Sequence, residues 1–377
     1  MKILFFIYHG FSDISGISKK MQYQIDGLRQ SGNIVDVCQY TFLENGHRVR
    51  MVNEDVIQDY GVGRLAAIKK RIDYSGIKDY IKSHNYDIVY VRSFHNANPF
   101  TINLFRCIKS TGAKIAFEIP TYPYDKEYQG FSIRNRIGLK IDKLFRNKLV
   151  SISDAVVTFT DDKTIFGKRT ISISNGVDFD AIPLQNKEKL NDNIINLVGV
   201  AEVHYWHGFD RLIAGLGEYY KKKHVKDIFF HIIGGIAPSE MDGSVYAKGF
   251  SKIITEYGIE DKVLFHGPLY GEKLDRVLNI ADFAVGSLGR HRTGVFNMKS
   301  LKNREYTARG IPFIYSETDT DFDNKDFILK APADDTPIDI DIILDFLNKH
   351  KVVASSIRES IKYLSWNKQM KKVIDNI

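Results

Sequence analysis

Short apolar runs of strand length alternate with amphipathic segments of helix length along the whole chain, and this alternation limits the possible folds more than any other feature. It is typical of parallel sheets covered by helices. Strand-like runs begin at residues 2, 33, 87, 114, 154 and 170 in the first half and at residues 195, 228, 262, 281 and 312 in the second. Helical patterns, for example over residues 17–29 and 98–110, lie between them. The sequence predicts an α/β protein.

A polar, charged stretch at Leu184–Asn193 separates the two series of strands. With 377 residues, the chain exceeds the size at which a single hydrophobic core usually stops growing. We therefore predict two Rossmann-like domains that face each other across a cleft, the first over residues 1–184 and the second over residues 194–360, with a linker at 185–193. Residues 361–377 are predicted to form a helix that packs back on the N-terminal domain.

The composition is that of a globular protein, with 44% hydrophobic and 26% charged residues. No apolar run approaches the roughly 18 to 20 residues that would span a bilayer. The apolar start of the chain is short and has no small-residue cleavage site, so we interpret it as a buried first strand. The two cysteines, Cys38 and Cys107, lack metal-ligand spacing. We expect a cytoplasmic protein without a zinc site.

The net charge of +7 favours an anionic partner. The densest basic stretch, Ser132–Val150, has six Lys or Arg and a single acid, Asp142. Helical spacing puts Ile137, Ile141 and Leu144 on an apolar face with Ile133, Phe145 and Leu149, and puts Arg136, Lys143 and Arg146 on the other face. Two interpretations stay open: a surface helix packed on the core, or a helix that holds the protein at anionic lipid on the inner membrane face. No aromatic residues are interleaved as in nucleic-acid-binding modules, so we expect no nucleic-acid partner.

Ligands of open α/β sheets bind beyond the carboxyl ends of the strands, and two loops there have suitable residues. Gly16 opens the helix after the first strand, where backbone N–H groups can approach a phosphate or sugar, although a simple turn would also use glycine. His207 and Gly208 stand between a strand and an amphipathic helix, an arrangement that can hold a pyrophosphate. The G-x-G-x-x-A string at residues 61–66 is not interpreted as a dinucleotide site, because no buried strand precedes it.

The segment Asn297–Ser316 combines helix-forming residues, four basic side chains, the carboxylate of Glu305 and a Gly-Ile-Pro break before a strand. A carboxylate at a helix start can accept hydrogen bonds from both hydroxyls of a ribose, while N–H groups and lysines hold phosphates. The segment therefore indicates a nucleotide.

Together these stretches resemble the GT-B glycosyltransferases of family 4, also called glycosyl transferases group 1, over nearly the whole chain. NGVD at Asn175–Asp178 and ADFAVGSLG at Ala281–Gly289 are similar to family hallmarks, and EYTARGIPFI at Glu305–Ile314 is similar to the second half of the family's E-x7-E motif. In the family that second Glu binds the donor ribose, so the resemblance gives this role to Glu305. The tract EIPTYPYDKE at Glu118–Glu127 resembles a subgroup that acts in bacterial surface-polysaccharide assembly.

The chain departs from the family pattern at two places. Asn297 stands where the first Glu of the motif contacts the donor sugar, and Glu202 and His207 stand where an Arg and a Lys usually clamp the diphosphate. Lys299, Lys302, Arg290 and Arg292 are candidates to replace the missing charge. The predicted donor-binding residues are Gly16, His207, Gly208, Asn297, Lys299, Ser300, Leu301, Lys302 and Glu305.

The resemblance implies transfer of a sugar, with retention of configuration, from a UDP- or GDP-sugar to the hydroxyl of an acceptor such as a lipid-linked saccharide, without a cofactor or a metal ion. We interpret Asp319, Asp321 and Asp323 as a solvated loop and not as a manganese site. Glu118, at a strand end, is the first candidate for the general base, and His95 is the second. A nucleotide-sugar epimerase of the same fold and a non-catalytic nucleotide-sugar-binding protein stay as alternatives.

Overall fold

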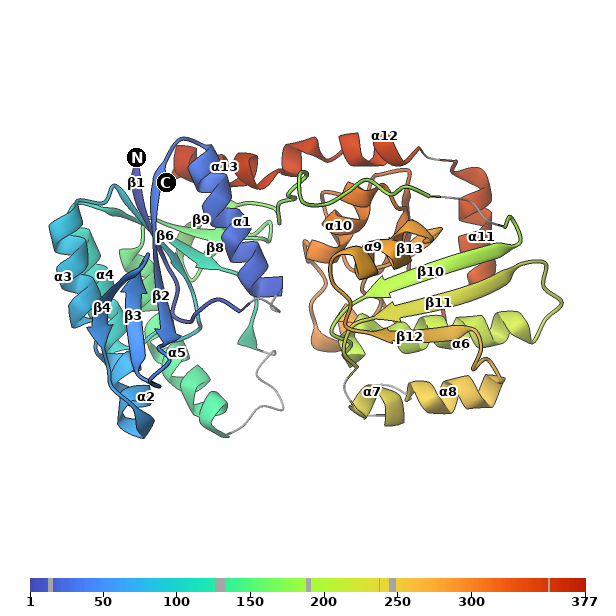
Figure 1. The fold of residues 1–377 in the computed structure, drawn as a ribbon, viewed down its shortest axis with the longest axis horizontal. Helices are drawn as coiled ribbons and strands as arrows, with labels where there is room; N and C mark the ends of the chain where they lie inside the picture. Colours follow the sequence, from blue (N-terminus) through green and yellow to red (C-terminus); the bar gives the residue numbers. More distant parts are fainter. Residues whose placement is uncertain (13–15, 126–132, 188–190, 237, 244–248, 352) are drawn as a thin grey trace. The chain divides into compact units, whose positions relative to one another are not determined.

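The computed structural model describes residues 1–12, 16–125, 133–187, 191–236, 238–243, 249–351 and 353–377. The chain forms two compact units: unit 1 is Met1–Gly176 with Leu364–Ile377, and unit 2 is Val177–Tyr363. Each unit has its own sheet with helices around it (Figure 1). The division falls earlier than the sequence boundary at residue 184.

Residues of the predicted linker that the structure describes bind to unit 2. The backbone N–H of Gln185 donates to the carbonyl of Arg309 at 2.8 Å, and its side-chain amide donates to the carbonyl of Ala281 at 2.8 Å. Lys187 pairs with Asp282. The polar composition of this stretch therefore reflects hydrogen bonds to carbonyl and carboxylate groups of unit 2.

Unit 1 contains a nine-stranded sheet in the order β4-β3-β2-β1-β5-β6-β7-β9-β8. The central strands from β2 to β9 are parallel, whereas β3 is antiparallel to both its neighbours and β8 is antiparallel to β9. The strands are β1 (Lys2–Phe6), β2 (Ile34–Phe42), β3 (Arg48–Val52), β4 (Asp55–Asp59), β5 (Ile88–Arg92), β6 (Lys114–Ile119), β7 (Ala155–Thr158), β8 (Thr164–Ile165) and β9 (Lys168–Ser172). The helices are α1 (Gly16–Gln30), α2 (Gly63–Ile72), α3 (Ser75–His84), α4 (Pro99–Ser110), α5 (Ile133–Ile152) and α13 (Trp366–Asn376).

The first strand shows how unit 1 is packed. Its alternating residues enter two different cores, as the period of two in a strand requires. Leu4 and Phe6 join a core with α3 and α4, while Ile3 and Phe5 join a core with α1 and α13. Because both faces are covered, the run is apolar throughout, which is the pattern of a buried parallel strand.

The C-terminal helix α13 packs on α1, and Trp366 at its start lies against two glycines, Gly27 of α1 and Gly176 after β9. A Cβ atom at Gly176 would lie 2.4 Å from the Trp366 side chain, and one at Gly27 would lie 2.8 Å from the Trp366 backbone carbonyl. The glycine of the NGVD stretch therefore makes room for the indole ring. Met370 and Val373 bury the rest of this contact.

Unit 2 contains a six-stranded parallel sheet in the order β12-β11-β10-β13-β14-β15. Its strands are β10 (Ile194–Val200), β11 (Asp227–Ile233), β12 (Val263–Gly267), β13 (Phe283–Val285), β14 (Phe313–Tyr315) and β15 (Ile328–Lys330). Its helices are α6 (Phe209–Tyr220), α7 (Pro238–Asp242), α8 (Phe250–Tyr257), α9 (Glu272–Asn279), α10 (Leu301–Arg309), α11 (Ile340–Lys349) and α12 (Ala354–Glu359). The 3-10 turns are η2 (Tyr205–His207), η3 (Arg290–Thr293) and η4 (Lys362–Leu364), the last ending at the boundary with unit 1.

The α/β prediction is confirmed, and all eleven predicted strand-like runs contain a strand. The sequence analysis missed the β3–β4 hairpin, because its strands do not form clean apolar runs. Arg50 of β3 is 1% exposed and donates to the Tyr60 hydroxyl at 3.1 Å. The strand β4 precedes the G-x-G-x-x-A string, but it is an antiparallel edge strand with no fully buried residue. It therefore does not have the buried parallel position of a dinucleotide-binding strand.

The prediction of which face of α5 is buried was wrong in part. Ile137, Ile141 and Leu144 are exposed, whereas Arg146 is partly buried and pairs with Asp125 at 2.6 Å. Leu149 and the other buried residues at the end of the helix, together with Asp142, set the orientation. Among the described residues, no helix is long and apolar enough to cross a bilayer.

Candidate functional site

The strand order of unit 2 reverses between β10 and β13, from which the sheet extends in opposite directions. In open α/β sheets, ligands bind beyond the carboxyl ends of the strands at such a switch point. The loops after β10, β13 and β14 and the start of α10 lie on this side of the sheet. The predicted donor-binding residues of unit 2 fall on these segments, except Glu305, which lies in the middle of α10.

The loop after β10 places the start of α6 at the switch point. Gly208 has a φ of 66° and is the N-cap of α6. A Cβ atom here would lie 2.6 Å from the backbone of both Leu288 and Gly289, so both the backbone angle and the close approach require glycine. The N–H of Leu288 donates to the His207 carbonyl at 2.8 Å. The loops after β10 and β13 are thus held together beside a helix N-terminus, where backbone N–H groups favour an anion.

Arg292 fastens the same two loops and is not available as a phosphate ligand. Its guanidinium donates to both carboxylate oxygens of Asp210, at 2.9 and 2.8 Å, and to the Tyr205 carbonyl at 2.7 Å. It also donates to Asp335 at 2.7 Å. Of the four basic candidates named from the sequence, Arg292 therefore has a structural role.

The helix α10 presents Lys302 and Glu305 on one side. These residues are three apart, so they are neighbours on the helix surface. Glu305 is about one-third exposed and pairs with Arg309 at 3.1 Å. The N-cap Ser300 is buried, and Leu301 is 39% exposed. The remaining residues of the helix are buried: Asn303, Arg304, Tyr306, Thr307, Ala308 and Arg309.

A cluster of charged and polar groups lies at the first turn of α10. The Lys302 ammonium donates to the Ser287 hydroxyl, at the end of β13, over 3.5 Å. Burial, together with the charge of Arg290, lowers the pKa of Lys302 to about 7. Burial also raises the pKa of Glu317, just after β14, to about 7. Burial, followed by the charges of Lys302 and Arg290, lowers the pKa of His207 well below its usual value, so that its ring is neutral.

Glu317 is the residue of this cluster that sequence reasoning missed. It is 2% exposed, and neither of its carboxylate oxygens has a hydrogen-bond partner among the described residues. Asn297 is close to it in the backbone, because Asn297 forms a short parallel bridge with Thr318. Its position directly after a strand was the available signal, and the sequence analysis did not use it. Lys299, also in the predicted set, is 9% exposed.

The sequence analysis predicted that the acidic stretch after Glu317 is a solvated loop, and this prediction was wrong. Asp319 is fully buried, and the buried Arg304 guanidinium donates to both Asp319 and Asp321. Asp323 accepts from the Tyr315 hydroxyl at 2.5 Å and pairs with Lys330 at 2.9 Å. Asp319 and Asp321 thus fix the loop after β14 to α10, whereas Asp323 fixes it to β14 and β15. In the part of the chain that the structure describes, no group of three or more His, Cys, Asp or Glu side chains could hold a metal ion.

In unit 1, Glu118 lies in a closed polar network. Its carboxylate is fully buried and accepts from the Arg92 guanidinium, from the Tyr90 hydroxyl at 2.5 Å and from the Gln24 amide at 2.7 Å. Burial acts to raise the pKa of Glu118, but the charges of Arg92 and Lys20 outweigh it and lower the pKa. Such an internal ion pair is poorly suited to take a proton from a substrate, although its role stays a prediction.

His95 and Gly16 lie on other loops of unit 1. His95 has a φ of 48° and stacks on Tyr124, with ring centroids 3.8 Å apart. Burial lowers the pKa of His95 to about 4, so its imidazole is neutral at pH 7. Gly16 is exposed, and apart from its chain neighbours and the backbone of its own helix, no atom of the described residues lies within 4 Å of the position that a Cβ would take. Its role in donor binding stays a prediction.

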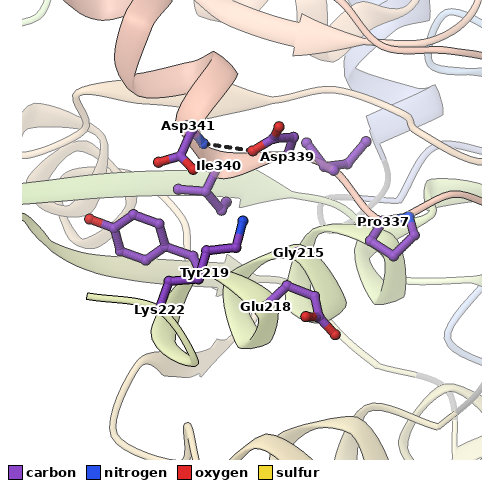
Figure 2. Close-up of a pocket in the computed structure, with 9 residues that line it drawn as sticks. Gly215, Glu218, Tyr219, Lys222, Pro337, Asp339, Ile340 and Asp341 are labelled. Atoms are coloured by element: carbon purple, nitrogen blue, oxygen red, sulfur yellow. Dashed lines mark hydrogen bonds between the residues drawn. The ribbon is translucent and has the colours of Figure 1, made fainter. Parts of the chain in front are cut away.

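A small cavity of about 140 Å³ lies elsewhere in unit 2, between α6 and the start of α11 (Figure 2). Gly215, Tyr219 and Ile340 line it, with Glu218, Lys222 and Asp341 at its charged edge. None of the predicted site residues contributes to it. A second hollow, of about 240 Å³, lies in unit 1 between the loop around Asp161 and the end of α13.

Comparison with known protein families and with curated protein sequences finds no match. Solved structures, however, are similar over the full length of the chain. Sucrose-phosphate synthase from Thermosynechococcus elongatus has a TM-score of 0.66 at 15% identity, covering 99% of this chain and 97% of its own. Anabaena HepE in complex with UDP-glucose has a TM-score of 0.59 at 15% identity, covering 100% of both chains.

A third similar structure, from Listeria monocytogenes, is provisionally assigned as a UDP-N-acetylglucosamine 2-epimerase. Its TM-score is 0.55 at 13% identity, covering 99% of this chain and 94% of its own. At these identities the likeness concerns architecture. Two α/β units with parallel sheets, matched along their whole length, show that this chain has the GT-B fold.

Proposed function

We propose that this protein is a glycosyltransferase that moves a sugar from a UDP- or GDP-sugar to an acceptor hydroxyl, with retention of configuration and without a metal ion. The observation that carries the proposal is the cluster at the switch point of unit 2. There, Lys302 and Arg290 lie near the N-termini of α6 and α10, and burial makes the positive charge of Lys302 costly unless an anion is bound. A diphosphate would supply that negative charge.

The proposed roles follow the order of groups along α10. Ser300, Leu301 and Lys302 form its N-terminal turn and would hold the phosphates, through backbone N–H groups and the ammonium. Glu305, one turn further on the same side, would accept hydrogen bonds from the ribose hydroxyls. Glu317 and Asn297 would accept from hydroxyls of the donor sugar, because a buried carboxylate with unused oxygens gains most from such donors. His207 would contribute its backbone and a neutral ring.

In the proposed reaction, the bond between the anomeric carbon and the diphosphate oxygen breaks, and a bond to the acceptor oxygen forms on the same face of the sugar. The diphosphate leaves with the bonding electrons, and its charge is stabilised by Lys302, Arg290 and the helix N-termini. The acceptor hydroxyl loses its proton. We prefer His95 to Glu118 as the acceptor of this proton, because both Glu118 oxygens already accept hydrogen bonds.

The nature of the acceptor is proposed from the sequence and from the surface of unit 1. The tract at Glu118–Glu127 resembles enzymes of bacterial surface-polysaccharide assembly, which suggests a lipid-linked saccharide at the inner face of the membrane. Exposed basic residues of α5, among them Arg136 and Lys140, support a position next to anionic lipid. Residues 126–132, which include the end of this tract and lead into α5, lie outside the described residues.

An isothermal titration with UDP and with GDP tests the donor site. We expect Lys302→Gln and Arg290→Gln each to lower the affinity for the preferred nucleotide at least tenfold, because each removes one of the cations that would face the diphosphate. The control is Lys273→Gln, an exposed lysine of α9. Unchanged affinity in both site variants would contradict the proposal.

Product analysis separates the transferase from the alternatives, of which the epimerase is favoured by one of the similar structures. A transferase gives free nucleoside diphosphate and glycosylated acceptor in equal amounts. An epimerase changes the sugar or releases the nucleotide without an acceptor, and a binding protein gives neither product.

A further inference from the structure

The helix α2 presents its long apolar side chains to solvent. Leu65 is 74% exposed, Ile68 is 54% exposed and Ile72 is 41% exposed. The one buried residue of the helix is Ala66, which packs on Tyr40 and Tyr60. A surface helix ordinarily turns its large apolar residues inward, so this helix has the reverse arrangement.

The helix α5 has the same property. Ile137 is 54% exposed, Ile141 is 41% exposed and Leu144 is 77% exposed. They are spaced by four and three residues, so they form one stripe along the helix. Single exposed apolar residues are common, but stripes on two helices of one unit are not explained by packing among the residues that the structure describes.

The two stripes lie toward the same end of the sheet of unit 1. The strand β4 runs parallel to β1, because β2 is parallel to β1 and β3 is antiparallel to both β2 and β4. The helix α2 starts just beyond the carboxyl end of β4. The helix α5 ends just before β7, so its start points toward the same edge. Figure 1 shows α2 and the start of α5 at the lower edge of unit 1, and α4 packs against both helices. Phe100, 46% exposed, lies in the first turn of α4.

We call Leu65, Ile68, Phe100, Ile137, Ile141 and Leu144 the α2–α5 face. Its charge is strongly positive: α2 contains four basic residues and no acid, and α5 contains six basic residues and one acid. Arg64, Lys69, Arg136 and Lys140 are exposed on these helices. Apolar side chains flanked by Lys and Arg are the pattern of elements that lie in the boundary of an anionic bilayer.

We propose that the α2–α5 face docks on an anionic lipid bilayer, with its apolar side chains entering the headgroup boundary and its basic side chains pairing with lipid phosphates. The inference deepens the proposed function, because it gives the surface next to which a lipid-linked acceptor would be met. The sequence indicated only α5 as a membrane-binding helix, and the structure adds α2 to this surface. Arg146 is no longer counted among the lipid-binding residues, because it pairs with Asp125 at 2.6 Å and lies 4.3 Å from the centre of the Phe166 ring.

Vesicle co-sedimentation of the full chain tests the charge. The vesicles are phosphatidylcholine alone or phosphatidylcholine with phosphatidylglycerol. We expect binding only to the anionic vesicles, with a steep decrease as salt rises. A quadruple variant with Arg64→Gln, Lys69→Gln, Arg136→Gln and Lys140→Gln should lower partitioning to the vesicles at least tenfold. Each basic residue near the surface raises partitioning by about fivefold. The control replaces four exposed lysines of unit 2 with glutamine and so removes the same charge: Lys222, Lys223, Lys349 and Lys351.

A second pair of variants tests the apolar stripes. Leu65→Ser with Ile68→Ser, or Ile141→Ser with Leu144→Ser, should reduce binding to anionic vesicles at low salt by severalfold, whereas Val225→Ser with Ile342→Ser in unit 2 should not. Leu65→Trp and Leu144→Trp should each be quenched by brominated lipid. These positions are exposed, so folding is checked simply by an unchanged melting temperature.

Equal binding to neutral vesicles, or equal loss in the unit 2 control, would overturn the inference. So would a monomer–dimer equilibrium in light scattering that the serine variants abolish while vesicles do not bind, because the face would then be covered by a second copy. Nucleotide titration of the same variants separates the two proposals. Lost vesicle binding with nucleotide affinity intact is the expected result for the variants, and a wild-type chain that binds vesicles but no nucleotide would contradict only the proposed function.

Discussion

Lys302 and Glu317 lie close enough in unit 2 for each charge to affect the other, and burial moves the pKa of both groups to about 7. The two groups come from different loops, one at the start of α10 and one after β14. A Lys and a carboxylate that both have a pKa near 7 change protonation readily when a charged or hydrogen-bonding ligand binds. This pair is therefore the part of the site whose substitution is most informative.

Glu317→Gln should separate sugar recognition from nucleotide binding. If Glu317 accepts hydrogen bonds from the donor sugar, the affinity for the best of UDP-glucose, UDP-galactose and UDP-N-acetylglucosamine should decrease about tenfold, while the affinity for UDP changes little. Calorimetry measures both, and Glu272→Gln, at an exposed position of α9, is the control. An equal loss for UDP and UDP-sugar would mean that Glu317 acts through Lys302 and not on the sugar.

Glu305→Ala should lower the affinity for UDP or GDP at least tenfold, because the ribose hydroxyls lose a charged hydrogen-bond acceptor. The melting temperature should change little, since Glu305 is about one-third exposed and its partner Arg309 also pairs with Asp275 at 2.8 Å. Calorimetry and thermal unfolding give the two values. Unaffected nucleotide affinity would show that the match to the E-x7-E motif is misplaced.

Turnover, once a donor and an acceptor are identified, should survive an excess of EDTA. The proposed site stabilises the leaving diphosphate with cations and helix N-termini, so a divalent ion has no assigned task.

Asp319→Asn should destabilise the fold by about 3 to 5 kcal/mol, because it leaves the buried Arg304 charge without its full partner. Urea unfolding measures that loss. Strict dependence on manganese or magnesium would refute the assignment of the acidic stretch to a structural role.

Acid should weaken unit 2 through His231. This side chain is 6% exposed, one ring nitrogen lies 2.9 Å from His266 and the other lies 3.1 Å from Asn196, and burial lowers its pKa to about 4. Because its unfolded pKa is near 6.5, the unfolded chain binds more protons between these values. The stabilisation is complete above pH 6.5 and is lost as the pH falls toward 4, by about 3 kcal/mol.

The measurement is the free energy of urea unfolding across that range. The advantage of the wild type over His231→Asn should shrink as the pH decreases from 6.5 to 4. His224→Asn, an exposed histidine in the loop before β11, should follow the wild-type profile. A wild-type advantage that stays constant with pH would rule out His231 as the source.

The sequence by itself determined the parts of this protein that depend on local periodicity. Eleven apolar runs became strands because a parallel strand covered on both faces needs apolar residues throughout, and Gly208 stands between a strand and a helix where backbone geometry requires it. Lys302 and Glu305 could also be placed on one side of a helix, since residues three apart on a helix always are neighbours.

Only the tertiary structure decided which charged groups are bound and which are exposed. The sequence predicted Asp319 in a solvated loop and offered Arg292 as a phosphate ligand. Instead, Arg292 and the Arg304–Asp319 pair join loops that meet only because distant strands pair in one sheet. The same holds for Glu118 in unit 1. The exposed face of α5 also follows from long-range contacts, because a helix with apolar residues around much of its circumference can bury either side. Burial and partner choice are properties of the assembled layers, and no single stretch of sequence contains them.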